Sequence, residues 1–118
     1  MKKKGQSIPI NILTIVIVVI IIFLIINYYN KPKQETPEAV AKCIGEKSIL
    51  YVQIGCSHCK DQEDTFGDNL KYLNIIDCFY EKDKCIEKEI TGTPTWIING
   101  EKMEGVQSIE KLKELTGC

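Results

Sequence analysis

The chain contains no arginine, and its 15 basic residues are all lysines. It also has only one histidine and one tryptophan, and no acidic residue precedes Glu35. Nucleic-acid-binding domains carry a basic patch, and the absence of one here excludes nucleic acid as an expected partner. Internal repeats are missing as well, and the one segment of biased composition is an apolar run near the N-terminus.

This apolar run extends from about Ile8 to Ile26 and holds no charged residue. Three lysines at positions 2–4 precede it, and Tyr28 and Tyr29 follow it. A membrane-spanning helix needs roughly 20 apolar residues, with aromatic residues at the interface. A cleaved signal peptide has a shorter apolar region and small residues at its cleavage site, which this segment lacks. We therefore expect an uncleaved anchor in the lipid bilayer.

The sequence divides into four expected parts. Residues 1–7 are a cytoplasmic N-terminus, residues 8–29 the transmembrane anchor, residues 30–41 a polar linker and residues 42–118 one folded domain. The lysines before the anchor keep the N-terminus in the cytoplasm, so the chain is expected to be a single-pass membrane protein with an extracytoplasmic C-terminal domain. That domain is acidic, because all 16 acidic residues lie after the anchor.

All six cysteines fall after the anchor, at Cys43, Cys56, Cys59, Cys78, Cys85 and Cys118. An even number in a small exported domain favours disulfides over free thiols. Spacing favours the pair Cys56 and Cys59, whereas Cys78 and Cys85 flank a short polar loop that a structural disulfide would close. Cys43 and Cys118 remain by elimination, and the terminal Cys118 could also stay unpaired.

The run Cys56-Ser57-His58-Cys59 lies where an apolar strand, residues 48–54, gives way to a polar helix from Ser57 to about residue 73. The first sulfur is therefore expected at a helix N-terminus, where free N–H groups and the helix dipole stabilise a thiolate. The second sulfur lies one turn further, within reach of a disulfide. This arrangement predicts thiol–disulfide exchange.

Further elements are expected downstream. They are a strand within residues 73–79, a short helix at 82–89, strands at 95–98 and 102–105 around an Asn99-Gly100 turn, and a last helix capped by Ser108. The order β-α-β-α-β-β-α, with C-x-x-C after the first strand and Thr93-Pro94 before the third, resembles the thioredoxin family. The resemblance implies a small α/β thioredoxin-like fold. It also implies a cis-proline at Pro94 beside the disulfide, with Thr93 and Pro94 binding the substrate chain.

Several segments are similar to the membrane-linked thioredoxin-like domains associated with vitamin K epoxide reductase homologues. These segments are Lys42-Cys43, the C-x-H-C site, the cysteine pair after the second strand, and residues 93–97 and 104–112. The reductase-like membrane domain is absent, so a quinone-linked redox partner would be a separate membrane protein. Leu50 stands where thioredoxins carry a buried acid, which argues against a thioredoxin-style reductase mechanism.

We expect Cys56 to be the nucleophile and Cys59 to resolve the mixed disulfide. His58 is expected to donate to the Cys56 thiolate and so to favour a strongly oxidising, DsbA-like couple. The expected function is a thiol–disulfide oxidoreductase that donates disulfides to exported cysteine-containing proteins and needs no cofactor. The alternatives are a thioredoxin-like reductase or isomerase and a non-catalytic or metal-binding module. Adjacent His58 and Cys59 suit a tetrahedral site poorly, so no metal is expected.

Overall fold

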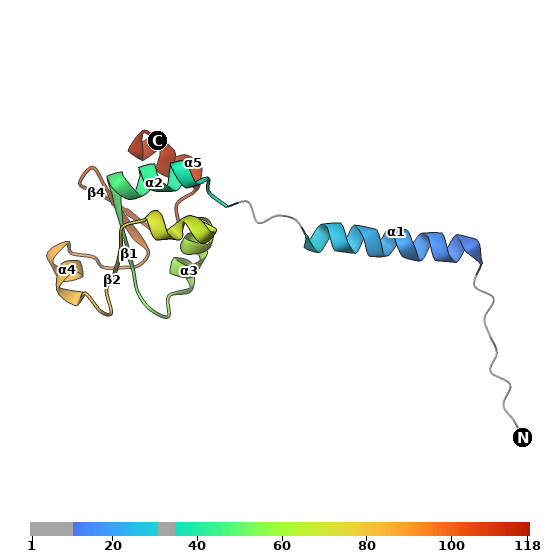
Figure 1. Ribbon diagram of the computed structural model, residues 1–118. Helices are drawn as coiled ribbons and strands as arrows, with labels where there is room; N and C mark the ends of the chain where they lie inside the picture. The colour runs from blue at the N-terminus through green and yellow to red at the C-terminus, as the bar shows by residue number, and fades with distance from the viewer. Residues whose placement is uncertain (1–10, 31–34) are drawn as a thin grey trace, which may run out of the picture. The chain divides into compact units, whose positions relative to one another are not determined.

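The computed structural model describes residues 11–30 and 35–118, which belong to two separate compact units. The first unit contains helix α1 (Ile12–Tyr29), which has 18 residues and a mean hydropathy of 2.9 (Figure 1). Such a helix is about 27 Å long, which approaches the roughly 30 Å of a bilayer core. By length and composition, α1 is able to cross a membrane. Residues 1–10 and 31–34, which include the start of the expected anchor and part of the expected linker, lie outside the described residues.

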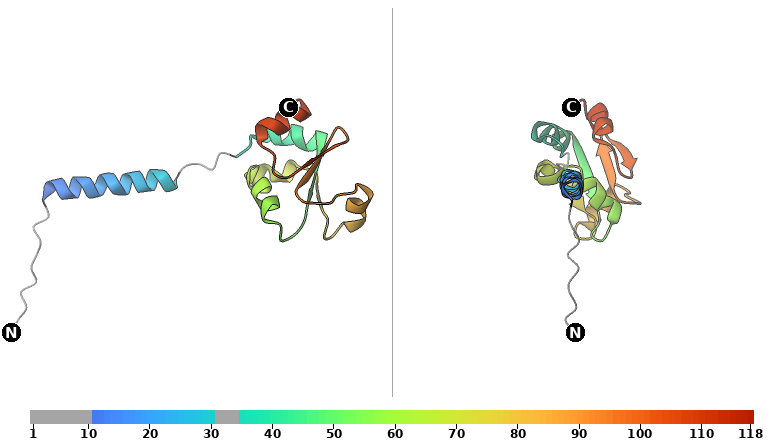
Figure 2. Two further views of the ribbon diagram at one scale, coloured as in Figure 1. Left: turned by 180° about the vertical axis from the view of Figure 1, so that it is seen from behind. Right: turned by 90° about the vertical axis from the view of Figure 1, so that its right-hand side faces the viewer.

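A four-stranded sheet lies at the centre of the second unit (Figure 2). Its strand order is β2-β1-β3-β4. The strands are β1 (Ser48–Val52), β2 (Ile75–Asp77), β3 (Thr95–Ile98) and β4 (Glu101–Glu104). β1 pairs in parallel with β2 and antiparallel with β3, and β3 pairs antiparallel with β4 across the Asn99-Gly100 turn. The parallel pair requires a crossover connection between β1 and β2, and this connection carries the C-x-x-C helix.

The described residues of this unit also form α2 (Glu38–Lys47), α3 (Ser57–Asp64), the 3₁₀ helix η1 (Gly67–Tyr72), α4 (Lys82–Glu87) and α5 (Ile109–Thr116). The prediction of a small α/β thioredoxin-like fold preceded by one apolar helix is confirmed. The single helix predicted from Ser57 to residue 73 is divided in two, because Gly67 has a φ of +53°. Glycine adopts this left-handed backbone conformation readily. A residue in that conformation cannot continue a right-handed helix.

The main core lies on one face of the sheet, where Leu50, Val52, Trp96 and Ile98 alternate with residues of the other face. The other members of this core are Ala41 and Ile44 of α2, Cys59 of α3, Leu112 of α5, and Phe66, which lies just after α3. A smaller cluster of Tyr51, Ile76 and Cys85 covers the other face. The second cysteine of the C-x-x-C motif is therefore part of the main core, which fixes the helix that carries the motif.

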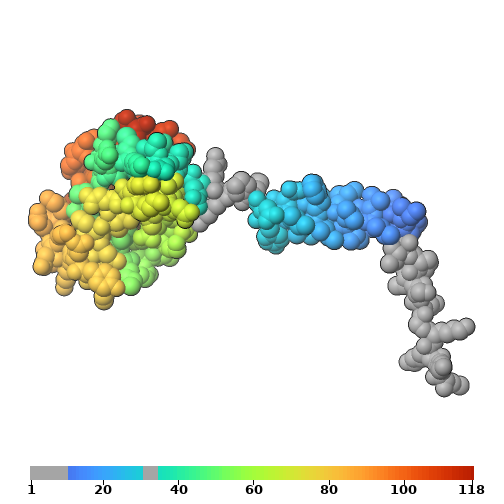
Figure 3. Space-filling model, in the orientation of Figure 1, coloured from blue at the N-terminus to red at the C-terminus, as the bar shows by residue number. Residues whose placement is uncertain are grey.

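Helix α2 corrects the predicted linker, which extended to residue 41. The helix begins at Glu38 and buries Ala41 and Ile44 in the core, so the folded unit starts before residue 42. α2 and η1 lie side by side in the space-filling view (Figure 3). Their backbones approach so closely that a Cβ on Gly45 would lie 2.0 Å from the Tyr72 carbonyl oxygen. We did not predict this helix from the sequence because its apolar stretch is short and directly follows a polar, proline-containing segment.

Three disulfides join the six cysteines: Cys43–Cys118, Cys56–Cys59 and Cys78–Cys85. The first spans 75 residues and ties α2 to the last residue of the chain. The third connects the end of β2 to α4. Two of the bridges therefore link elements of the scaffold, and the remaining one lies at the start of α3.

Candidate active site

Cys56 is the N-cap residue of α3, and its sulfur accepts a hydrogen bond from the Cys59 N–H, with 3.1 Å between N and Sγ. The chain reaches this point through a turn after β1, in which the Cys56 N–H donates to the Gln53 carbonyl at 3.1 Å. The first N–H groups of a helix have no partner within the helix, so the sulfur takes the place that Ser or Asp often fills. A thiolate at Cys56 would be stabilised by this N–H and by the helix dipole.

The two sulfurs of the disulfide differ in accessibility. Cys59 is buried, with 3% of its surface exposed, whereas Cys56 is half-buried. An incoming thiolate therefore reaches Cys56 more readily. Attack at Cys56 would make Cys59 the leaving sulfur, and the roles expected for the two cysteines stay a prediction.

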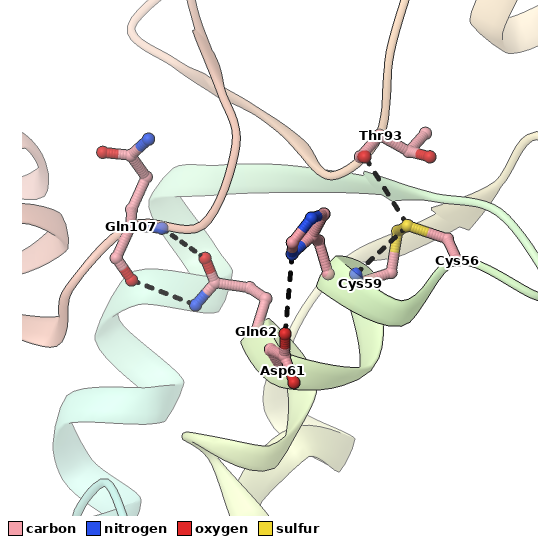
Figure 4. A network of polar contacts seen from close by, with 7 residues as sticks. Cys56, Cys59, Asp61, Gln62, Thr93 and Gln107 are labelled. Atoms are coloured by element: carbon pink, nitrogen blue, oxygen red, sulfur yellow. Dashed lines mark hydrogen bonds and ion pairs between the residues drawn. A yellow bond between two sulfur atoms is a disulfide. The ribbon is translucent and has the colours of Figure 1, made fainter.

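Thr93 lies against the disulfide (Figure 4), and the peptide bond that joins it to Pro94 is cis. The Thr93 carbonyl oxygen is 3.5 Å from the Cys56 sulfur. A disulfide sulfur carries no proton, so this contact can become a hydrogen bond only after Cys56 is reduced to a thiol. The Pro94 carbonyl accepts a hydrogen bond from the Gly105 N–H at 2.8 Å, which connects the proline segment to the loop after β4.

His58 pairs with Asp61, with 3.6 Å between Nδ1 and Oδ2. Both side chains lie on the outside of α3 and are 76% and 68% exposed. With the disulfide closed, the described residues include no hydrogen bond from His58 to Cys56. The expectation that His58 stabilises the Cys56 thiolate stays a prediction, and Asp61 is a competing partner for the imidazole.

A cleft of about 460 Å³ opens beside Cys56. It is lined by Val52, Gln53, Ile54, Gly55, Cys56, Ser57, Cys59, Lys60, Glu63 and Asp77. The hydrogen bond from Lys60 to Asp64 holds the pKa of the Lys60 amine above its usual value. Lys60 therefore keeps its positive charge next to the cleft. Within residues 11–30 and 35–118, no three His, Cys, Asp or Glu side chains gather into a potential metal site.

Sequence reasoning missed Gln62, whose side chain is fully buried in α3. Its side-chain oxygen accepts a hydrogen bond from the Trp96 indole N–H at 3.0 Å. Cys59, Gln62 and Phe66 are spaced as i, i+3 and i+7, the spacing of a helix face that packs against a core. A polar residue in such a face indicates a buried hydrogen-bond network, and this signal could have identified Gln62.

The chain is similar to the thiol-disulfide oxidoreductase LTO1 of Arabidopsis thaliana. The two are 39% identical over 94 residues, which cover 70% of this chain and 25% of LTO1. The chain thus spans about a quarter of the length of this curated relative. No family model matches the chain.

Two solved structures of the alkylhydroperoxide reductase AhpF from Enterococcus faecalis are more distantly similar. One is the C503A mutant of AhpF, with 19% identity and a TM-score of 0.47, over 70% of this chain and 45% of that chain. The other is the NTD N/C domain of AhpF, with 20% identity and a TM-score of 0.46 over the same shares.

Proposed function

We propose that the protein is a membrane-anchored thiol–disulfide oxidoreductase that passes its Cys56–Cys59 disulfide to exported proteins. The observation that carries this proposal is the position of the Cys56 sulfur, which caps α3 and lies 3.5 Å from the carbonyl oxygen next to a cis-proline. The similarity to a protein named thiol-disulfide oxidoreductase, over 70% of the chain, supports the same chemistry.

The reaction takes place in two exchanges. A substrate thiolate attacks the Cys56 sulfur, a substrate–Cys56 disulfide forms, the Cys56–Cys59 bond breaks, and Cys59 leaves as a thiolate that takes a proton from solvent. A second substrate thiolate then attacks the substrate sulfur of the mixed disulfide and releases Cys56 as a thiolate. The substrate loses two electrons and two protons and gains a disulfide, while the protein is reduced to a dithiol.

The environment of Cys56 favours donation over reduction. The Cys59 N–H and the start of α3 stabilise the Cys56 thiolate, and with it the reduced protein. A stabilised reduced form makes the couple more oxidising. Leu50 is fully buried in the core and has no group that could exchange a proton with Cys59, so the proton that the Cys59 thiolate takes up is expected to come from solvent through the neighbouring cleft.

The reduced protein must be oxidised again after each transfer. We propose that a separate quinone-linked membrane protein accepts the two electrons, and that α1 holds the folded unit on the extracytoplasmic side of the same bilayer. The three lysines before α1 support this orientation, because positive flanks stay in the cytoplasm.

The deciding measurement is the reduction potential of the full chain in detergent micelles, equilibrated in glutathione buffers. A disulfide donor should have a potential between about −120 and −180 mV. A potential near about −270 mV would instead indicate a reductase. Cys56→Ser is the control, and an equilibrium that does not depend on Cys56 would overturn the proposed chemistry.

A further inference from the structure

We propose that Gln62 is a positioning residue that sets how the Cys56 sulfur meets the backbone of Thr93 and Pro94, and thereby determines reactivity towards protein substrates. This inference rests on the proposed disulfide exchange and adds to it a residue that does not touch the reacting sulfurs. Three features support the inference. All hydrogen-bonding groups of the Gln62 side chain have partners, these partners lie on different elements of the fold, and few residues of α3 are buried.

Every hydrogen-bonding group of the Gln62 side chain has a partner. Its Nε2 donates to the Gln107 carbonyl at 3.1 Å and to the Thr65 hydroxyl at 3.4 Å. Its Oε1 accepts from the Trp96 Nε1 at 3.0 Å and from the Gln107 backbone N–H at 2.7 Å. An amide has two donor hydrogens and two acceptor lone pairs, so the side chain is fully satisfied although none of it is exposed.

These bonds join the helix that carries the disulfide to two other segments of the fold. Gln62 lies on α3, which begins next to Cys56, and Trp96 lies on β3, two residues after Pro94. Gln107 lies in the loop after β4, and the same loop reaches Pro94 through the hydrogen bond from Gly105. Gln62 is therefore connected to the cis-proline segment in two ways, through Trp96 and through the loop after β4. Figure 4 shows the hydrogen bonds between Gln62 and Gln107, which belong to the second connection.

Few other contacts hold α3 in place. The helix has only eight residues, and of these only Cys59 and Gln62 are buried. Phe66 follows the helix and contacts the Trp96 ring, with 6.1 Å between ring centroids. When the Cys56–Cys59 disulfide opens, α3 loses its covalent link across the first turn. The Gln62 network then restrains this helix relative to the cis-proline segment, together with the hydrogen bond that a Cys56 thiol can donate to the Thr93 carbonyl.

This role predicts that two kinds of substrate respond differently to a change at Gln62. A small dithiol such as dithiothreitol needs only access to the Cys56 sulfur. A peptide must also align its backbone with Thr93 and Pro94, so its reaction depends on the relative placement of α3 and this segment. Misplacement of reacting groups by about 1 Å can lower a rate up to about 100-fold.

The experiment compares the full chain in detergent with its Gln62→Leu and Gln62→Glu variants. Gln62→Leu removes all four hydrogen bonds, whereas Gln62→Glu keeps an acceptor for Trp96 and Gln107 and removes both donors. Ile98→Val, a change in the same core that leaves the network intact, is the control for reduced stability. For each protein, the oxidation rate of a reduced two-cysteine peptide and the reaction rate with dithiothreitol are measured.

We expect Gln62→Leu to lower kcat/KM for the peptide by about 10-fold or more, with the dithiothreitol rate within about twofold of the unchanged protein. The kcat/KM of Gln62→Glu for the peptide should lie between the values of the unchanged protein and of Gln62→Leu. This variant provides the test if the leucine variant fails to fold. Ile98→Val should lower the melting temperature without separating the two rates. Equal losses in both rates, or no loss with the peptide, would overturn the role of Gln62. Failure of the unchanged protein to react with dithiothreitol through Cys56 would overturn the proposed function instead.

Discussion

The backbone N–H of Cys59 donates to the sulfur of Cys56 over 3.1 Å, so the first cysteine of the pair caps the main chain of the second. This donor does not depend on the side chain of Cys59. It is in place while the disulfide is closed, and we expect it to remain when Cys56 becomes a thiolate. In the proposed mechanism, the main chain of α3 thus stabilises the Cys56 sulfur that substrates attack, while the side chain of Cys59 acts as the leaving group.

Replacing Cys59 with serine should preserve the Cys56 thiolate and remove the thiol that would displace a bound substrate from it. The Cys56 thiolate of Cys59→Ser should attack the disulfide of an oxidised substrate protein, release one substrate thiolate and accumulate as a mixed disulfide, which non-reducing electrophoresis and mass spectrometry would identify. The matched variant Cys56→Ser should trap few or none, because Cys59 is only 3% exposed. Comparable trapping by the two variants would contradict the assignment of Cys56 as the sulfur that substrates attack.

His58 should tune the potential even though it faces Asp61 in the oxidised protein. Its imidazole adjoins the N-terminus of α3, and a proton on it would stabilise the Cys56 thiolate. His58→Ala should make the reduction potential more negative by about 30 mV for each tenfold loss of oxidising strength. Asp61→Asn frees the imidazole from its carboxylate partner and should not shift the potential in that direction. An unchanged potential in His58→Ala would leave the helix N-terminus as the source of thiolate stabilisation.

The Cys43–Cys118 disulfide should contribute more to stability than its remote position suggests. It closes a segment of 75 residues, and the chain-entropy relation gives about 4.5 kcal/mol for a loop of this length. The same relation gives about 2.5 kcal/mol for Cys78–Cys85. Replacing each pair by serines and measuring urea unfolding in detergent should reproduce this order. The opposite order would show that strain or residual structure in the unfolded chain outweighs loop length.

A charge placed in the middle of α1 should reduce membrane insertion. Lysine at the centre of a spanning helix costs about 2.5 to 3.5 kcal/mol on insertion scales, so Ile20→Lys should move a large part of the protein into the carbonate-soluble fraction. Tyr29→Lys makes the same change at the end of α1, where the side chain can reach the interface, and should stay with the membrane. Full retention of Ile20→Lys would argue against α1 as the spanning segment.

Glu38 should make stability depend on pH in the acidic range. Its hydrogen bonds from Lys42 and Tyr72 hold the pKa of the carboxyl below the ordinary 4.5. A carboxyl with a lowered folded-state pKa contributes stability that is present above the unfolded-state pKa and lost as the pH falls through the folded-state pKa. Glu38→Gln should therefore lower the melting temperature at neutral pH, and the difference should disappear in strong acid. A difference in melting temperature that persists in strong acid would contradict this role of Glu38.

Local signals were sufficient for much of the folded unit. β3 has the bounds predicted from its apolar run and the Asn99-Gly100 turn, and Ser108 caps α5 by accepting a hydrogen bond from the Lys111 N–H. Helix α2 and the break at Gly67 were not predictable from such signals. α2 is stabilised by non-local contacts with η1 and α5, and a single glycine within helical spacing does not by itself indicate a positive φ.

The candidate site shows the same division. The C-x-x-C motif and Thr93-Pro94 could be identified because the chemistry resides in the residue types and in their places at strand ends. The partner of His58 depends on a side-chain rotamer on an exposed surface, which the sequence does not specify. The network of Gln62 depends on Trp96 and Gln107, which lie 34 and 45 residues away along the chain.

Trp96 gives this site an optical property of its own. It is the only tryptophan in the chain, and it is fully buried. Its indole N–H donates a hydrogen bond to Gln62, on the helix that carries the disulfide. Indole emission responds to the hydrogen bonding and polarity around the ring, and all tryptophan emission here comes from this one position. Opening and closing of the Cys56–Cys59 bridge should therefore be readable in real time by intrinsic fluorescence, without a label or a coupled assay.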